Sequence, residues 1–386
     1  MSAEMSPKTD PGAGPDETDL RELAAVVDEL LAEGRAHRDS RQHSGRSTQD
    51  ESLWDQAVWE DLVDNGFAHV GIAESAGGSG GGLREAAVLL RAVGRHAVAV
   101  PLAEVGLAGW LLETSGGRLG DGLTTVGAGN LVATPADGGV RVVGRLTRVA
   151  FARQARTVVA LAAPAPHRPE TDGTESATPE LVVSIPVADC RITPGRNVAG
   201  EARDDLLVDT VLPSSAAEAA VIGAARELRL RGALARAVSS AGAMSGLVSQ
   251  TSQYVREREQ FGRPLAAFQA VQQSMALLAA EAAAAGTAAD AAVRICAERG
   301  CASPEAELAV AAAKVRTAQA ATVGAATAHQ MHGAIGMTYE HALRHTTSRL
   351  WSWRSEWGGE RTWADQLGQL AMNAGGAGLW DALTKA

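Results

Sequence analysis

The sequence predicts an α+β protein: a helical N-terminal domain, then a small β-barrel or β-sandwich domain, then a C-terminal four-helix bundle. Apolar residues first recur at helical spacing, short runs rich in Val, Leu and Thr follow, and the rest of the chain is rich in Ala. With 386 residues, of which 46% are hydrophobic, the chain is too long for one simple core. The expected division is a disordered tail at 1–17, the helical domain at 18–120, the β domain at 121–213 and the bundle at 214–386.

The N-terminal domain is predicted from four helical segments. The first has Thr18 as its expected N-cap and an apolar stripe of Leu20, Leu23, Val27, Leu30 and Leu31. A polar loop is expected at 35–50, and Gly66 should end the second helix in a left-handed conformation. The second stripe is Trp54, Val58, Leu62 and Val63, and two more helices are expected near 83–93 and 102–112.

The β domain is predicted from runs of strand length bounded by Gly, Pro and Asp. These runs are 140–143, 157–162, 181–185 and 206–212, with a polar, Pro-bearing loop at 163–180.

The C-terminal bundle is predicted from stretches dominated by Ala, the residue with the best helix propensity. These stretches are 216–250, 265–299 and 304–331, and Pro264 and Pro304 are expected at helix starts.

Charge and composition exclude several function classes. The net charge of −10 argues against non-specific nucleic-acid binding. No uninterrupted apolar run is long enough to cross a bilayer, and the acidic start carries no secretory signal. Three cysteines in a chain of this length do not form a disulfide framework. We therefore expect a soluble, cytoplasmic protein with no membrane or nucleic-acid partner.

Four features have ordinary structural readings that are favoured over functional ones. The glycine run 77–82 lacks the Lys of a phosphate-binding loop and predicts a flexible entry to a helix. His341 and His345 have metal-pair spacing but no third ligand, so we expect capping or solvent-facing histidines and no metal site. Cys296 and Cys301 are expected to be buried. Five tryptophans near the C-terminus favour core or subunit packing over a ligand pocket: Trp351, Trp353, Trp357, Trp363 and Trp380.

The segment 254–272, YVREREQFGRPLAAFQAVQ, is the most informative. Arg258 and Phe261 stand three apart at a helix end, a Gly-x-Pro turn follows, and Gln269 begins the next helix. Arginine can clamp a phosphate and an aromatic ring can stack on a base. Taken as isolated residues, a surface arginine and a core phenylalanine remain the stronger reading.

This segment resembles the RExQFGxPxxxFQAVQ signature of the acyl-CoA dehydrogenase family. The later run QMHGAIGMT at 330–338 is similar to that family's QxHGGxGYT signature, and GIAE at 71–74 with the following glycines resembles its GVPEEYGGxG loop. The resemblance extends from about residue 20 to the end. It implies the acyl-CoA dehydrogenase fold, FAD as cofactor and α,β-dehydrogenation of an acyl-CoA thioester.

The resemblance also implies a flavin site shared between subunits. Arg258, Phe261 and Gln269 occupy positions that contact the FAD pyrophosphate and adenine. In the second signature, the positions whose backbone meets the ADP portion of a neighbouring subunit's flavin are Gln330, Gly333 and Ala334. Ala334 replaces the family's second glycine.

The rest of the family's site is eroded. The stretches 128–134 and 148–151 lack the hydroxyl pattern that holds the flavin ring. The slot of the catalytic glutamate falls on Trp357, with Glu356 one residue early and Glu360 three late. The family's other location for the base falls near Gly232.

This sequence keeps the ADP-binding positions and lacks the catalytic glutamate. In this combination, it resembles the partner subunits of actinobacterial heteromeric acyl-CoA dehydrogenases, including those for steroid side chains. We therefore expect a heterotetramer in which a homologous chain supplies the base, a bulky acyl-CoA is the substrate and electron-transfer flavoprotein is the acceptor. No catalytic residue is expected in this chain, Glu356 being the weak candidate. Two alternatives remain open: a self-sufficient homotetramer that uses Glu356, and a structural subunit that binds no flavin.

Overall fold

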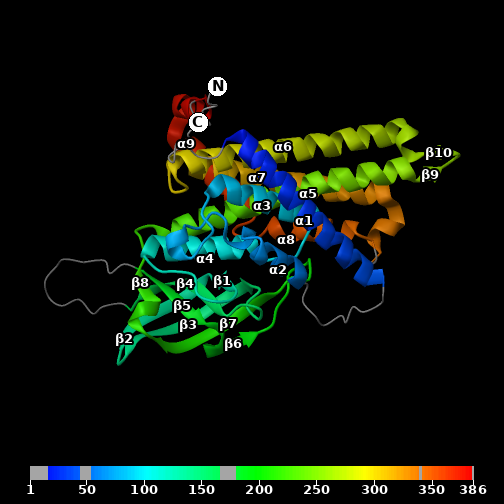
Figure 1. Ribbon diagram of the computed structural model, residues 1–386. Helices are drawn as coiled ribbons and strands as arrows, with labels where there is room; N and C mark the ends of the chain where they lie inside the picture. Colours follow the sequence, from blue (N-terminus) through cyan, green and yellow to red (C-terminus); the bar gives the residue numbers. More distant parts are fainter. Residues whose placement is uncertain (1–15, 44–53, 166–179, 339–340, 385–386) are drawn as a thin grey trace, which may run out of the picture.

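The computed structural model describes residues 16–43, 54–165, 180–338 and 341–384. Helices form one layer and a twisted sheet packs beneath it (Figure 1). Helix α4 (Leu102–Ser115) packs on the sheet and on the C-terminal helices, and α1 (Glu17–His43) runs diagonally across the helical layer in this view. The predicted tail lies almost wholly outside the described residues. The order of helices, sheet and helices is as the sequence predicts.

The N-terminal part contains the helices α1 (Glu17–His43), α2 (Gln56–Asp64), α3 (Leu83–His96) and α4 (Leu102–Ser115). Two expectations for α1 are wrong. The Asp16 carboxylate, and not Thr18, caps the helix, because it accepts hydrogen bonds from the backbone N–H groups of Thr18 and Asp19 at 2.6 and 2.9 Å. The expected loop at 35–50 is helical through His43, because a polar stretch without Gly or Pro does not end a helix.

The end of α2 follows the sequence prediction. Gly66 has φ +75°, as expected of a residue just beyond a helix. Val58 and Leu62 are buried, but Val63 is 41% exposed and lies off the apolar stripe.

The sheet has eight strands in the order β6-β7-β3-β2-β4-β5-β8, with β1 pairing parallel to β4. The strands are β1 (Thr124–Val126), β2 (Gly129–Ala136), β3 (Gly139–Ala150), β4 (Thr157–Pro164), β5 (Leu181–Pro186), β6 (Cys190–Thr193), β7 (Arg203–Leu212) and β8 (Ala217–Ala219). All four predicted runs lie within strands, whereas β8 begins a segment predicted to be helical. Strand β8 pairs with β5, so tertiary pairing overrides the helix propensity of Ala there.

The C-terminal part is built on α5 (Ala224–Glu257), α6 (Gln269–Arg299) and α7 (Pro304–His332), followed by α8 (Leu343–Trp353) and α9 (Glu360–Thr384). Pro304 is the first residue of α7, as predicted, and the Ser303 side chain caps that helix. Pro264 lies in β10 (Arg263–Pro264), which pairs with β9 (Glu259–Gln260) in a hairpin between α5 and α6. It is also the N-cap of a short 3-10 helix, Leu265–Ala267, that precedes α6.

Glycines bring α3 and α5 into backbone contact. A β-carbon on Gly94 would stand 1.9 Å from the Ser239 carbonyl oxygen, and one on Gly242 would stand 2.0 Å from that of Arg91. The two helices therefore cross closely, which fixes the N-terminal helices against the bundle.

Helix α6 is the one helix in the described ranges that is long and apolar enough, by length and composition, to cross a membrane. It packs along α5 and α7 as a member of the bundle (Figure 1). A single helix of this kind is weak evidence for a membrane span.

Candidate functional site

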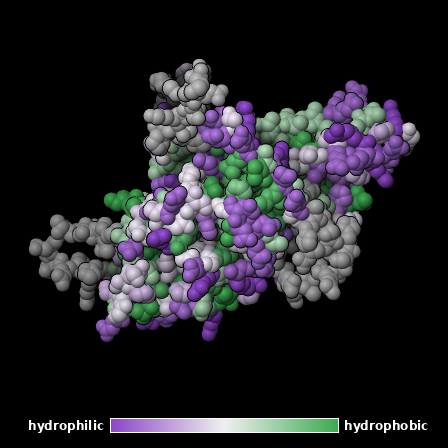
Figure 2. All heavy atoms as spheres, in the orientation of Figure 1, coloured by the Kyte–Doolittle hydropathy of each residue, from purple (hydrophilic) through white to green (hydrophobic). Residues whose placement is uncertain are grey.

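Six residues singled out by the sequence lie on the surface. Arg258, Phe261 and Gln269 flank or form the β9–β10 hairpin, at the end of the bundle remote from α9 (Figure 1). On the face drawn in Figure 2, this end is hydrophilic. Gln330, Gly333 and Ala334 lie where α7 ends, and all six residues are exposed.

The hairpin presents its side chains to solvent. The Leu265 backbone N–H donates to the Arg258 carbonyl at 2.8 Å and closes the turn. Phe261 has φ +52° and is 90% exposed, so it is not the core phenylalanine that isolated residues would suggest. Its ring meets Phe268 edge-on at 6.1 Å, and the Arg263 guanidinium lies 4.1 Å from the centre of the Phe268 ring. An exposed aromatic side chain on a residue with a positive φ is available to a ligand or to another chain.

The end of α7 offers open backbone. Gly333 has φ +62° and ψ −148°, and a β-carbon there would meet nothing within 4 Å. A short 3-10 turn, Gly333–Met337, follows and includes Ala334. A ligand can approach this backbone closely, and the Gly333 N–H itself donates to the His329 carbonyl oxygen.

One aromatic contact brings the two segments together. Tyr254, one helical turn before Arg258, stacks on His332 with ring centres 4.3 Å apart. The Tyr254 hydroxyl also donates to the His332 carbonyl oxygen at 3.3 Å. Arg258 and Gly333 are therefore carried on helix ends that touch.

A separate cavity of about 470 Å³ lies between the sheet and the helices. Residues from the stretches 128–134 and 148–151, which lack the family's hydroxyl pattern, line this cavity. Trp357, at the position of the family's catalytic glutamate, lines it as well. Its lining includes Ala128, Thr147, Arg148, Val149, Ala150, Ser355, Glu356 and Trp357, with Glu104, Arg203 and Arg236. The segments that the sequence identified as departures from the family thus surround one space.

Glu356 is held by two arginines. Its Oε1 accepts from Arg203 Nε at 2.8 Å and its Oε2 lies 2.7 Å from Arg236 Nε. The Asn197 amide also donates to Oε1 at 3.3 Å. Burial alone would raise the pKa of this carboxyl, but Arg203 and Arg236 lower it to about 2. A carboxylate in this state is a poor proton acceptor near neutral pH.

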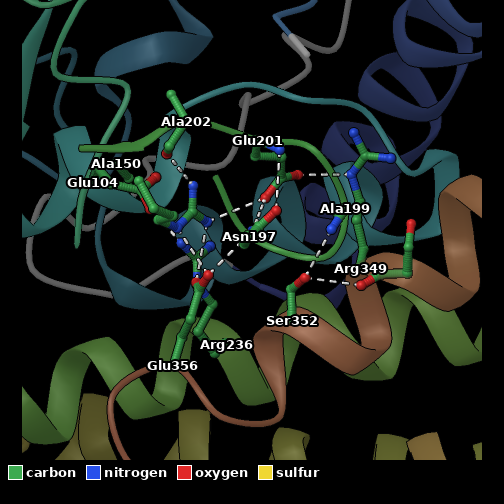
Figure 3. A network of polar contacts seen from close by, with 12 residues as sticks. Glu104, Ala150, Asn197, Ala199, Glu201, Ala202, Arg236, Arg349, Ser352 and Glu356 are labelled. Carbon is green, nitrogen blue, oxygen red and sulfur yellow. Dashed lines mark hydrogen bonds and ion pairs between the residues drawn. The ribbon is translucent and has the colours of Figure 1, made fainter. Parts of the chain in front are cut away.

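These contacts belong to a chain of six alternating charges (Figure 3). In order, the members are Glu104, Arg236, Glu356, Arg203, Glu201 and Arg349. The side chain of Glu356 is 9% exposed and the other five are 7% exposed or less. The charges sum to zero, which is the condition under which buried ions are tolerated. This network of six charges connects α4, α5, the turn after α8 and the start of β7, and its last member lies on α8.

Trp357 fills the predicted slot of the base. It has φ +56°, and its indole lies on α5 at Gly232, where a β-carbon would come 2.2 Å from Trp357 Cδ2. Its carbonyl oxygen accepts from the indole N–H of Trp363 at 3.0 Å. The two positions where the resemblance would place a base, 232 and 357, thus pack directly against each other.

The buried lysine and arginines were not predicted from the sequence, although the position of Lys314 offered one signal. The chain has three lysines, and Lys314 is the one away from the termini. Its side chain is buried in α7 and donates to the Trp353 carbonyl oxygen at 2.7 Å, at the end of α8. Burial lowers the pKa of this amine to about 7, against a smaller opposing effect of Glu356.

The weaker sequence candidates have structural roles. The glycine run forms the entry to α3, and Cys296 and Cys301 are buried, as predicted. His341 precedes α8, and its Nδ1 accepts from the Leu343 backbone N–H at 3.2 Å, whereas His345 is buried within α8, so the expectation of a surface position is wrong for His345. Within the described ranges, no group of three His, Cys, Asp or Glu residues is placed to hold a metal.

The tryptophans divide between core and surface. Trp353 and Trp363 are buried, as the packing interpretation predicts, and Trp357 lines the cavity. Trp351 is 42% and Trp380 67% exposed.

The sequence of this chain is similar to those of known proteins. Residues 224–357, from the start of α5 to Trp357, match the family described as "Acyl-CoA dehydrogenase, C-terminal domain". Acyl-CoA dehydrogenase IpdE2 of Mycobacterium tuberculosis is 29% identical over 296 residues, which cover 75% of this chain and 79% of the relative. FadE28 of the same organism is 31% identical over 248 residues, which cover 56% of this chain and 65% of FadE28.

Solved structures share the fold over nearly the whole chain. The ChsE4-ChsE5 complex from Mycobacterium tuberculosis matches with a TM-score of 0.78 and 22% identity, covering 92% of this chain and 97% of that one. The Tcur3481-Tcur3483 steroid ACAD matches with a TM-score of 0.77 and 22% identity, covering 92% and 98%. A glutaryl-CoA dehydrogenase from Mycobacterium smegmatis in complex with FADH2 has a TM-score of 0.73 at 17% identity, covering 96% of each chain.

Proposed function

We propose, from the premise that residues 224–357 are an acyl-CoA dehydrogenase C-terminal domain on an acyl-CoA dehydrogenase fold, that this chain is one subunit of a heteromeric FAD-dependent acyl-CoA dehydrogenase. In this role, it holds the ADP portion of an FAD whose ring lies in a homologous partner chain. The partner supplies the carboxylate that removes the α-proton of the acyl-CoA. The observation that carries the proposal is that Glu356, the carboxylate nearest the base slot, is committed to Arg203 and Arg236.

The surface residues suit the ADP portion of FAD. A pyrophosphate needs a cationic partner and close approach to the backbone. Arg258 offers the first, and the open backbone at Gly333, whose own N–H donates to His329, allows the second. The exposed Phe261 ring can cover the adenine, and the exposed Gln269 and Gln330 offer side-chain amides to the cofactor. All six residues face solvent in the single chain, as expected of a site that a second chain completes.

The interior does not suit the flavin ring or the acyl group. The cavity beside the β domain is walled by Trp357 and by Arg203 and Arg236, whose charges Glu356 already satisfies. A second, apolar cavity between α3, α4 and α5 has a volume of about 90 Å³. Ligand pockets commonly need ~300 Å³ or more, so this apolar cavity is too small for a bulky acyl chain.

The surface residues and the interior together define what this chain contributes to the reaction. FAD, when bound, accepts the β-hydrogen of the substrate as hydride. The residues of this chain contribute by holding and orienting the cofactor's ADP end through Arg258, Gly333 and Ala334. Glu356 does not move a proton in the proposed reaction, because it stays ionised and paired down to about pH 2.

The substrate class and the setting are inferred from the relatives. IpdE2 and FadE28 are described as acyl-CoA dehydrogenases, and the Tcur3481-Tcur3483 structure as a steroid ACAD. We infer a bulky acyl-CoA, such as a steroid side-chain thioester, as the substrate of the assembled enzyme. We also infer a cytoplasmic location and electron-transfer flavoprotein as the acceptor.

A flavin count tests the proposal. The chain is produced alone and together with a homologous chain that has an intact base loop, and FAD is measured per polypeptide in each purified sample. One FAD per two chains, only in the mixed complex, is the expected result. One FAD per chain in this protein alone, with dehydrogenase activity, supports a self-sufficient homotetramer and overturns the proposal. A mixed complex without flavin supports a purely structural subunit.

A further inference from the structure

Three aromatic rings form a cluster where α5 meets the end of α7. Tyr254 and His332 are stacked, with an angle of 24° between their planes. His341, from the segment before α8, stands edge-on to His332 with ring centres 5.0 Å apart and edge-on to Tyr254 at 6.3 Å. Such offset and edge-on contacts fix the relative position of the elements that carry the rings.

The hydroxyl of Tyr254 contacts a specific backbone atom. His332 is the last residue of α7, so its carbonyl oxygen has no partner within the helix. The Tyr254 O–H donates to this oxygen at 3.3 Å. The next residue is Gly333, where the chain leaves the helix with a positive φ. Tyr254 thus holds the backbone immediately before the turn that contains Gly333 and Ala334.

The imidazole of His332 is fixed as well. Its Nδ1 lies 2.8 Å from the Ala328 carbonyl oxygen, one turn back in α7, and the residue is buried. This contact assigns the proton to Nδ1 of the neutral ring. The ring therefore offers Tyr254 a flat surface in one orientation.

Tyr254 is also linked to the cationic side of the site. It precedes Arg258, the residue directly after the last turn of α5, by four residues. The Arg258 backbone N–H donates to the Tyr254 carbonyl oxygen at 2.8 Å and continues the helical bonding to that residue. A shift of Tyr254 relative to α7 therefore moves Arg258 relative to Gly333.

We propose that Tyr254, supported by His332 and His341, is a positioning residue that sets the separation between the Arg258 guanidinium and the Gly333 and Ala334 backbone. The inference rests on the proposed function, since it assigns this separation to the pyrophosphate of a bound FAD. Tyr254 itself touches neither the cofactor nor the substrate. Its contribution is to present both phosphate-binding elements at one spacing before the cofactor arrives.

The test compares variants of Tyr254 in the assembled complex by the dissociation constant of FAD, measured by flavin fluorescence. Tyr254→Phe keeps the ring stack and loses the hydroxyl contact, so we expect a weakening of roughly threefold to tenfold, the range for one hydrogen bond. Tyr254→Ala should weaken FAD binding further. Gln253→Ala, one residue away on the exposed face of the same turn, is the matched control and should leave the dissociation constant unchanged.

A double-mutant cycle separates positioning from general stability. If Tyr254 acts through Arg258, the combined Tyr254→Phe and Arg258→Ala variant loses less affinity than the sum of the two single losses. The flavin-free Tyr254→Phe complex should remain folded and assembled under the conditions of the FAD measurement, which gel filtration checks. If Tyr254→Ala does not assemble, Tyr254→Phe alone decides.

The outcomes distinguish the two proposals. If Arg258→Ala weakens FAD binding while both Tyr254 variants bind as wild type does, the positioning role is wrong and the proposed function stands. Fully additive losses would also overturn the positioning role. If Arg258→Ala leaves FAD binding unchanged, the proposed function itself fails.

Discussion

The indole of Trp357 lies directly against the α-carbon of Gly232, so that a β-carbon on this glycine would stand 2.2 Å from Cδ2 of the ring. Both positions correspond to places where the acyl-CoA dehydrogenase resemblance would put a catalytic glutamate. A side chain at 232 and an indole at 357 exclude each other on steric grounds. One packing contact therefore accounts for the absence of a carboxylate at both positions.

The first expectation concerns this contact. Gly232→Ala should lower the free energy of unfolding by about 1–3 kcal/mol, the range for overpacking a filled site, because the methyl group forces the indole from its place. Urea unfolding followed by tryptophan fluorescence measures the loss. Gly106→Ala in α4 is the matched control, because nothing lies within 4 Å of its added β-carbon. This control should be neutral or stabilising by up to ~1 kcal/mol. Equal effects of the two substitutions would show that Trp357 does not rest on Gly232.

Glu356 should be important for stability and unimportant for turnover. Glu356→Gln leaves Arg203 and Arg236 sharing one fewer negative charge in the interior, which should cost about 3–5 kcal/mol of folding free energy. Turnover of the assembled, folded complex should stay within about threefold of wild type, well below the 10²–10⁴-fold contribution of a general base. Denaturant unfolding and steady-state rates with an artificial electron acceptor check the two parts.

The control for this expectation is an ion pair on the sheet surface. Arg141 and Asp209 pair at 2.9 Å, but both side chains are more than half exposed. Asp209→Asn should therefore change stability by no more than about 1 kcal/mol. A hundredfold loss of turnover in Glu356→Gln, with normal flavin content, would show that this chain is catalytic in its own right.

Acid should weaken the fold through the same residue. The pKa of Glu356 is about 2 in the folded chain, below its ordinary 4.5, so the unfolded chain binds a proton more readily than the folded chain. The resulting stabilisation is complete above pH 4.5 and is lost as the pH falls toward 2. Unfolding free energies of wild type and Glu356→Gln, measured from pH 6 to pH 3, should therefore converge as the pH falls. Parallel curves would contradict the assigned pKa.

Most of the fold was predictable from local pattern, and the exceptions have tertiary causes. Stripes such as Val58 and Leu62, and runs such as 206–212, identify elements because burial follows the helical or strand period. The strand β8 could not be predicted, because its partner β5 is remote in sequence and its own residues favour helix. The extension of α1 to His43 was missed because polarity was taken as a sign of a loop.

The candidate site was predictable only in part. Arg258 and Gly333 stand in recognisable motifs, and the helix end at Arg258 was predicted, but the contact between their two helix ends was not. The six-charge chain could not, because Glu104, Arg236 and Arg349 are separated by more than a hundred residues each and sit in unremarkable helical sequence. Their pairing becomes visible only when α4, α5 and α8 converge on the start of β7 (Figure 3).

Arg258 should be required for cofactor retention. In the assembled complex, Arg258→Ala should weaken FAD binding by about 1–3 kcal/mol, the range for a charge-assisted contact to phosphate in a partly desolvated site. Arg256→Ala is a suitable control, because Arg256 is equally exposed and bonds within its own helix to Ser252 at 2.7 Å. Flavin content after dilution and gel filtration gives the comparison. Equal retention in both variants would remove Arg258 from the cofactor site.

The buried amine of Lys314 should make the protein more stable in mild alkali. Its pKa is about 7 in the folded chain, below its ordinary 10.5, so between these values the unfolded chain binds a proton that the folded chain lacks. Stability therefore rises with pH across this window, by at most about 1.4 kcal/mol per pH unit from this one group. Lys314→Met keeps the length of the side chain and removes the titrating amine, so its stability relative to wild type should fall steadily from pH 7 to pH 10. Other groups titrate equally in both proteins and cancel in the difference, which urea unfolding at each pH measures. A difference that stays constant over this range would show that Lys314 is charged in the folded protein and that its contact with the Trp353 carbonyl is a charged hydrogen bond at all these pH values.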